Sequence, residues 1–245
     1  MKKVTNVREG VEKLLTTYHR DIPDFKIEEK RDGEEFDTLI LNGERIPILD
    51  FRLDQRLRPM AGYGAIGGNS ALNAYSFVGC DVSLQSHIYQ ELAISEFLLN
   101  SKIKSITAFV NGNAANVIAS MENGSNANLE LGTTLAQGSQ CQCQHRLYTS
   151  HGMTNDRSVG TMTVNNQMAV FTEDSVSPTV YDDDEYYLYG LDENEVRKAM
   201  TVHDVIVGLE AYADWKDSCK RFREATNAVF TSASETRTVY IGEEK

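Results

Sequence analysis

The sequence predicts an α+β fold, a large mostly antiparallel sheet covered by helices on one face. Three observations predict it: strand-like segments follow one another without a helix between residues 102 and 173, an amphipathic helix precedes them at 84–99, and two helical segments follow at 192–232. Strands so close in sequence pair antiparallel, because parallel strands need long crossover connections. One face of such a sheet is left for the helices to cover.

The first 65 residues are expected to form an extension of one helix and a hairpin. Apolar residues recur at helical spacing within 6–19, and Pro23 ends that helix. The segment 25–48 alternates apolar and polar residues around the Asp-Gly pair at 32–33, and Asn42-Gly43 marks a second tight turn. We therefore expect an extension over 1–65 and a main α+β domain over 66–245.

A glycine-rich segment, AGYGAIGG at 61–68, has Gly62, Gly64 and Gly67 at the G-x-G-x-x-G spacing of dinucleotide-binding turns, with Asp81 where a ribose-binding acid would fall. That fingerprint requires a buried strand directly before the glycines and a helix directly after them. The charged residues before Gly62 do not resemble a buried strand, and 69–79 offers only a short helical stretch before an expected strand at 77–82. We interpret the glycines as a turn between two regions.

The main domain continues with a regular order of elements. The helix at 84–99 carries Leu84, Ile88 and Leu92 along one face. The strands that follow are expected at 102–110, 115–122, 126–135, 144–150, 159–164 and 167–173, and Asn123-Gly124 joins the second to the third. Asp192 and Glu195 form a capping box at the start of the C-terminal helices.

Composition excludes several classes of function. The chain has 245 residues, 41% of them hydrophobic, and its 24 Lys+Arg against 36 Asp+Glu give a net charge of -12. Such a charge repels phosphate backbones and anionic membrane surfaces, so no nucleic acid is expected as a partner. No apolar run approaches the roughly 20 residues that span a bilayer. We expect a cytoplasmic protein that does not associate with a membrane.

The four cysteines are expected to be reduced thiols. They are too few for a disulfide framework, and Cys141 and Cys143 are too close in sequence to pair easily. A zinc site formed by these two with His145 and His151 is the alternative to a strand that carries small polar residues. The spacing lacks the paired Cys-x-x-Cys of structural zinc sites, and we expect no bound metal.

The order of elements resembles the C-terminal, substrate-binding half of the Gfo/Idh/MocA oxidoreductases, the family of glucose-fructose oxidoreductase and inositol 2-dehydrogenase. The segments 79–109, 115–132 and 145–162 carry the resemblance, which extends over about residues 66–235. It implies a sheet whose uncovered face makes subunit contacts. The N-terminal Rossmann domain and the Glu-Lys-Pro motif of that family have no counterpart in this sequence.

The resemblance also implies catalytic residues. His87 matches the family's substrate-hydroxyl histidine, but Ser83 and Gln90 stand where the family has acids, and Asp81 is the nearest carboxylate. We therefore predict His87 and Asp81 as the catalytic pair. Independently of the resemblance, the expected loop 150–157 carries residue types that bind hydroxyls and carboxylates, and the alternative is an ordinary polar loop. Its predicted substrate-binding residues are His151, Asn155, Asp156 and Arg157.

Two further polar features are interpreted as structural. His203, on the first C-terminal helix, is expected to be a hydrogen-bonded helix histidine rather than a catalytic one. The acidic run at 181–187 is expected to be a solvated loop.

Two functional hypotheses follow. The first is a ligand-binding or assembly subunit that forms a homodimer through an open sheet face bearing Ile, Val, Leu, Met and Phe, and that binds a sugar-like molecule or a separate Rossmann subunit. It needs no cofactor of its own, and NAD or NADP would bind only if the partner supplied the Rossmann part. The second is a sugar or polyol oxidoreductase active in its own right, using NAD(P).

Overall fold

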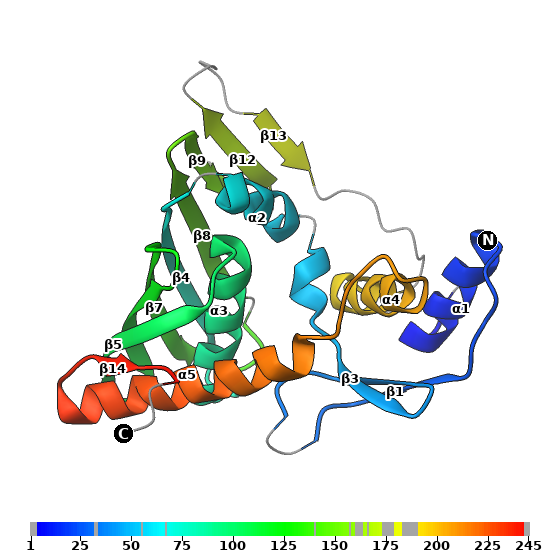
Figure 1. Cartoon of the computed structure of the whole chain (residues 1–245), viewed down its shortest axis with the longest axis horizontal. Coiled ribbons are helices and arrows are strands. Elements are labelled where there is room, and N and C mark those ends of the chain that lie inside the picture. The colour runs from blue at the N-terminus through cyan, green and yellow to red at the C-terminus, as the bar shows by residue number, and fades with distance from the viewer. Residues whose placement is uncertain are drawn as a thin grey trace. The chain divides into compact units, whose positions relative to one another are not determined.

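The computed structural model has an α+β fold with a large, mostly antiparallel sheet (Figure 1). It describes residues 4–31, 34–54, 56–66, 68–139, 141–156, 158–159, 164–165, 167–172, 179–182 and 191–242. Two compact units divide the chain: the first comprises 1–54 with 184–219, and the second 55–183 with 220–245. This division differs from the boundary predicted at residues 65 and 66, and the two-domain assignment stays a prediction.

The first unit combines two helices with a three-stranded sheet. Its elements are α1 (Val7–Thr17), β1 (Phe25–Glu28), β2 (Thr38–Leu41), β3 (Glu44–Pro47), the 3-10 helix η1 (Asp50–Leu53) and α4 (Glu193–Ile206). The turn predicted at Asn42-Gly43 is confirmed, because both residues have positive φ and join β2 to β3. The residues of the predicted turn at 32–33 lie outside the described part of the chain.

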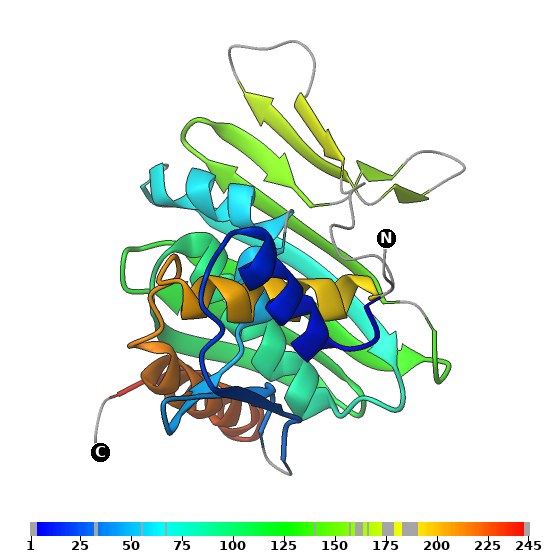
Figure 2. The same cartoon turned by 90° about the vertical axis from the view of Figure 1, so that its right-hand side faces the viewer.

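The helices of the first unit begin as the sequence indicates. Asn6 caps α1 by accepting a hydrogen bond from the backbone N–H of Glu9, and Asp192 forms the predicted capping box with Glu195 at α4. The two helices pack against each other (Figure 2). Their buried apolar residues form one core with those of the small sheet. This core includes Val11, Leu15, Leu39, Ile46, Leu49, Ala199, Val202 and Trp215.

The second unit contains the large sheet. Its elements are α2 (Leu57–Ile66), β4 (Ala71–Gly79), α3 (Leu84–Leu99), β5 (Ile103–Asn111), β6 (Ala114–Met121), β7 (Asn126–Leu135), β8 (Gln142–Thr149), β9 (Gly152–Asn155), β12 (Gln167–Thr172), β13 (Thr179–Asp182) and β14 (Val239–Tyr240). A separate two-stranded ribbon pairs β10 (Ser158–Val159) with β11 (Val164–Asn165). The helix α5 (Trp215–Glu235) contributes its residues to the second unit from Lys220 onward.

Nine described strands form the sheet in the order β13-β12-β9-β8-β4-β7-β6-β5-β14. All neighbours are antiparallel except β4 and β7, which run parallel. The expected simple meander is therefore wrong at one place, because β4 lies between β7 and β8. The prediction of a short helical stretch over 69–79 is wrong for the same segment, whose buried Leu72 and Ala74 alternate with exposed Ala71 and Asn73.

One face of the sheet is covered by helices, as predicted. The helix α3 has the predicted bounds, with Ser83 as its N-cap and Asn100, at φ 45°, as its C-cap, and it packs on β4, β6 and β7. Phe222 of α5 contacts Tyr89 of α3 edge-on, and Ser232 of α5 accepts a hydrogen bond from the Ala108 N–H of β5. Residues 193–206, expected among the covering helices, form α4 of the first unit.

Residues 61–66 of the glycine-rich segment lie in a helix rather than in the expected turn. Gly62 and Gly64 lie inside α2, so they cannot form a phosphate-binding loop between a strand and a helix. Gly64 is buried, and a Cβ placed there would lie only 1.9 Å from the Leu98 carbonyl oxygen of α3. Nothing lies within 4 Å of the same position on Gly62. Close packing of α2 on α3 therefore explains Gly64, and no ligand is needed.

Within the described residues, no helix is both long enough and apolar enough to cross a bilayer.

Substituting these two glycines by alanine should have opposite effects on stability. We expect Gly62→Ala to raise the free energy of unfolding by about 0.5–1 kcal/mol, because alanine is the better helix former at an open position. Gly64→Ala should lower it by about 1–3 kcal/mol, because α2 must move away from Leu98. Urea unfolding measures both, and equal effects of the two substitutions would contradict the helical packing.

Candidate functional site

A row of three charged side chains is buried between α3 and the sheet. Glu91 comes from α3, His145 from β8, and Asp156 follows directly after β9. The Nε2 atom of His145 lies 2.9 Å from Oε2 of Glu91, and its Nδ1 atom lies 2.5 Å from Oδ2 of Asp156. The side chains of Glu91 and His145 are each 5% exposed. The His145 imidazole is therefore held between two carboxylates.

The sequence positions each member of this row locally. His87 and Glu91 are four residues apart on α3, so they share the face that packs on the sheet. His145 is paired in register with the small residue Ala74 of β4 on the covered face. Asp156 is fixed by the β8–β9 hairpin, because its Oδ1 accepts a hydrogen bond from the His145 N–H at 2.7 Å and its own N–H donates to the His145 carbonyl.

The two carboxylates determine the protonation of His145. Burial by itself lowers the pKa of His145, but Asp156 and Glu91 outweigh burial and hold that pKa well above its ordinary value of 6.5. Burial raises the pKa of Glu91, and the charge and hydrogen bond of His145 outweigh it, so the pKa lies below 4.5. His145 is therefore an imidazolium at neutral pH and donates from both ring nitrogens.

His87 lies in the same layer with a different partner. It is 3% exposed, and its Nε2 atom is 3.0 Å from the backbone carbonyl oxygen of Ser76 on β4. The Ser76 hydroxyl lies 2.9 Å from Sγ of Cys143 and also hydrogen-bonds Glu91, which contributes to the low pKa of that carboxyl. His87 and the charged row are thus linked through Ser76.

This arrangement favours a structural role over proton transfer. A general base must offer a lone pair to a proton of the substrate, and an imidazolium with both N–H groups donated has none. The carboxylates on either side accept from His145 and are buried or nearly buried. Breaking a buried charge pair costs about 3–5 kcal/mol, so the row fixes α3 and the β8–β9 hairpin to one another.

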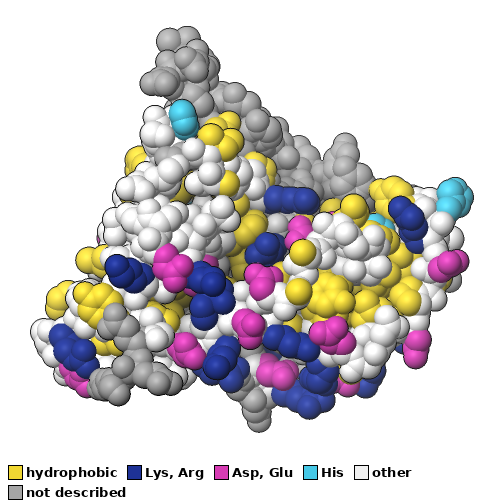
Figure 3. Space-filling model, in the orientation of Figure 1, with side chains coloured by type: hydrophobic (Ala, Val, Ile, Leu, Met, Phe, Trp, Pro, Cys, Tyr) yellow, Lys and Arg dark blue, Asp and Glu magenta, His cyan; other side chains and the backbone are white. Residues whose placement is uncertain are grey.

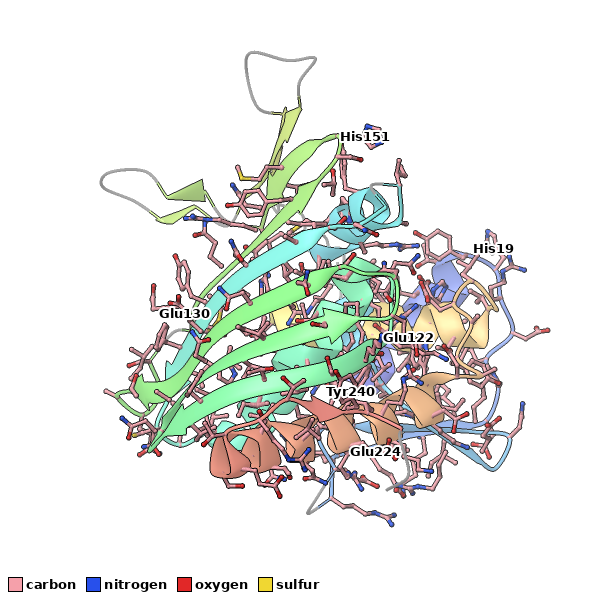
Figure 4. The ribbon with its side chains drawn as sticks, turned by 60° about the vertical axis from the view of Figure 1, so that its left-hand side comes forward. His19, Glu122, Glu130, His151, Glu224 and Tyr240 are labelled. Atoms are coloured by element: carbon pink, nitrogen blue, oxygen red, sulfur yellow. A yellow bond between two sulfur atoms is a disulfide. The ribbon has the colours of Figure 1, made fainter. Side chains whose placement is uncertain are left out.

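The predicted site residues are not brought together in one place. Asp81 is exposed in the turn before α3, whereas His87 lies on the buried face of that helix. His151 is exposed at the tip of the β8–β9 hairpin (Figure 4). Asn155 is 8% exposed, its Oδ1 has no partner among the described residues, and Asp156 pairs with His145. Arg157 lies outside the described residues. The catalytic and substrate-binding roles of these residues stay predictions.

Two local expectations need correction. The segment 150–157 is not an open loop, because a two-residue turn at Ser150 and His151 joins β8 directly to β9. Cys141 and Cys143, expected as reduced thiols, are joined by a disulfide in the structure, whereas Cys80 and Cys219 are free. Among the described residues, no group of three or more His, Cys, Asp or Glu side chains is arranged to hold a metal ion.

Sequence reasoning missed the two residues at the centre of this row, Glu91 and His145. One signal for Glu91 was present, since a carboxylate on the apolar face of a helix, between Ile88 and Leu92, is buried only when it is paired. His145 was considered only as a zinc ligand. Its partners come from 54 residues before it and 11 residues after it, so their proximity depends on the tertiary fold.

Comparison with known proteins identifies the fold. The chain matches the solved structure of an oxidoreductase from Agrobacterium radiobacter in complex with NAD+, L-tartaric acid and magnesium, with a TM-score of 0.60 and 15% identity over 97% of this chain and 70% of that one. It also matches an NAD-binding oxidoreductase from Klebsiella pneumoniae, with a TM-score of 0.60 and 13% identity over 80% of this chain and 66% of that one. A levoglucosan dehydrogenase in complex with NADH and levoglucosan matches with a TM-score of 0.57 and 11% identity over 79% and 65%.

The chain shares the fold of these oxidoreductases. No protein-family model matches it, and no curated protein sequence matches it. The chain covers about two thirds of the length of these three solved structures. At these sequence identities the likeness establishes the fold, which is the fold that the resemblance to the Gfo/Idh/MocA oxidoreductases implies.

The charged row predicts a pH window of maximum stability. The raised pKa of His145 contributes stability that is complete below pH 6.5 and is lost as pH rises through the folded-state pKa. The lowered pKa of Glu91 contributes stability that is complete above pH 4.5 and is lost as pH falls through the folded-state pKa. Urea unfolding should therefore give a maximum between pH 4.5 and 6.5 and a decline on both sides.

The variant His145→Gln provides the control for the alkaline side. It keeps a polar side chain but removes the imidazolium, so its stability should not decline between pH 6.5 and 9 as that of the parent does. A parent protein whose stability is constant over that range would contradict the proposed protonation of His145.

Proposed function

We propose that the chain is a ligand-binding or assembly subunit with the fold of NAD-dependent sugar and polyol oxidoreductases. One observation carries the proposal: the histidine and carboxylates of the charged row are buried and satisfy one another, which leaves none of them to abstract a proton from a substrate hydroxyl. A subunit of this kind binds a ligand or assembles with a partner, and it does not transfer a hydride by itself.

NAD or NADP enters this proposal only through a separate Rossmann subunit. A dinucleotide site places the pyrophosphate at a helix N-terminus that directly follows a strand and a glycine turn. In this chain Gly62 and Gly64 lie within α2, and Gly64 serves the contact with α3. The Agrobacterium enzyme is in complex with NAD+ and the levoglucosan dehydrogenase with NADH. In this chain residues 61–66 are helical and form no glycine turn for such a cofactor.

The uncovered face of the sheet is the proposed homodimer surface (Figure 4). Strand register aligns Thr107, Ile118, Asn128, Asn73 and Arg146 in one row across five strands, and Phe109, Asn116, Glu130, Tyr75 and Gln144 in the next. Of the apolar surface expected here, these rows carry Phe109 and Ile118, and buried residues of the same strands, such as Leu72, Val117 and Leu129, point to the helices. Amides and aromatic anchors suit a moderately polar interface between two copies.

Light scattering tests the dimer. The parent protein should scatter as a particle of twice 27.4 kDa at micromolar concentration. Replacing Phe109, which is 66% exposed on β5, by Asp should give monomers, because a two-fold interface places the new charge on both partners. Ile22→Asp, at a 51% exposed position of the first unit, is the matched control and should remain dimeric. A monomeric parent protein would contradict the proposal.

Ligand titration tests the function itself. We expect calorimetry to detect binding of myo-inositol or another polyol without NAD, and to detect no binding of NAD, NADH, NADP or NADPH. Incubating the chain with polyol and NAD should produce no NADH absorbance. NAD binding at micromolar concentration that is lost in Gly62→Ala would instead support the self-contained oxidoreductase, and so would polyol-dependent NADH formation.

A further inference from the structure

A cavity of about 500 Å3 lies in the first unit, beside the C-terminal ends of α1 and α4. Figure 3 shows hydrophobic side chains gathered over the region of these two helices. The volume of this cavity is within the range of pockets that bind small molecules. The lining residues are Leu14, Tyr18, Arg20, Met200, His203, Asp204, Val207 and Leu209.

The chain builds this cavity by ending both helices in the same way. After α1, His19 adopts a positive φ of 54°, and the N–H of Arg20 donates to the Leu15 carbonyl at 2.8 Å. After α4, Gly208 has a φ of 74°, and the N–H of Leu209 donates to the Asp204 carbonyl at 2.8 Å. The segment after each helix therefore folds back over the end of that helix. This places Arg20 in the cavity wall after α1 and Leu209 in the wall after α4.

His203 supplies an unmet polar atom in this wall. The residue is 8% exposed, its Nδ1 atom lies 2.8 Å from Oδ1 of Asp204, and its Nε2 atom is buried without a hydrogen-bond partner among the described residues. Among the described residues, the expected hydrogen bonding of His203 is therefore met at Nδ1 alone. With Nδ1 paired to the Asp204 carboxylate, Nε2 is the ring nitrogen left to hydrogen-bond a polar group that enters the cavity.

The charges around the cavity favour a neutral ligand. The helix ends of α1 and α4 carry partial negative charge, and the Asp204 carboxylate adds to it, which disfavours an anion. The guanidinium of Arg20 lines the cavity and disfavours a cation. A hydroxyl group is uncharged, so neither the helix ends nor Arg20 repels it. It can donate to Nε2 of His203, and its lone pairs can accept a hydrogen bond from a guanidinium.

We propose that this cavity binds a small phenol. The phenol hydroxyl donates to Nε2 of His203, and the ring contacts the apolar wall formed by Leu14, Met200 and Val207. The ring of Tyr18 lies 5.6 Å from that of His203 and provides an aromatic neighbour at the rim. The proposal concerns the first unit alone and does not depend on the function proposed for the sheet-bearing unit.

Three related probes test the proposal on the parent protein. They are 4-propylphenol, its methyl ether and 4-propylbenzoate, and NMR titration of the backbone amides of α1 and α4 measures their dissociation constants. The phenol should bind about tenfold more tightly than the ether, which lacks the donor, and more tightly than the anionic benzoate. Equal binding of phenol and ether, tighter binding of benzoate, or no binding of any probe would overturn the proposal.

Two variants test whether His203 is the hydrogen-bond partner of the phenol hydroxyl. His203→Phe keeps a ring beside Tyr18 but removes Nε2, so it should bind the phenol and the ether equally. His19→Asn, at an exposed position that tolerates positive φ, should keep the tenfold preference of the parent. A preference that survives His203→Phe would overturn the assignment. Because the probe comparison uses the parent alone, it decides the proposal even where His203→Phe fails to fold.

Discussion

An imidazolium buried between two carboxylates is the interaction on which the sheet-bearing unit depends. Removing charges from water costs several kcal/mol for each ion, and only close pairing offsets that cost. Here the ring of His145 meets Glu91 at 2.9 Å and Asp156 at 2.5 Å, and backbone hydrogen bonds hold Asp156 in place. The row thereby connects the covering helix α3 to the β8–β9 hairpin. A shift of either element would leave a buried charge without its partner.

This constraint also limits what the unit can do. The ionisable groups of the charged row hold the layers together and pair with one another, so they are not free to contact a ligand. Strand β4 contributes to the same network, because it lies between β7 and β8 and carries Ser76. The carbonyl of Ser76 hydrogen-bonds His87, and its hydroxyl hydrogen-bonds Glu91. The same fold in the Agrobacterium enzyme accompanies NAD and L-tartaric acid, but the fold by itself does not supply chemistry.

Features set by local sequence were predictable, and features set by distant contacts were not. The bounds of α3, the capping box at Asp192 and the turn at Asn42-Gly43 follow from nearby residues. The strand β4 was not predictable in this way, because its partner residues on β7 and β8 lie 55 to 77 residues further along the chain. The helix α2 contradicts the low helix propensity of glycine, since only glycine lets it approach Leu98 of α3. Likewise Glu91, His145 and Asp156 become one site only in the folded chain.

Protonation of the His145 ring is the most direct test of this account. Long-range 1H–15N correlation NMR at pH 7 distinguishes a ring with two protonated nitrogens from a neutral tautomer. The account predicts that both nitrogens of His145 carry protons at pH 7, and that Glu91→Gln lowers the pH at which the second proton is lost. A neutral His145 ring at pH 7 in the parent protein would contradict it, because a lone pair would then be left for catalysis.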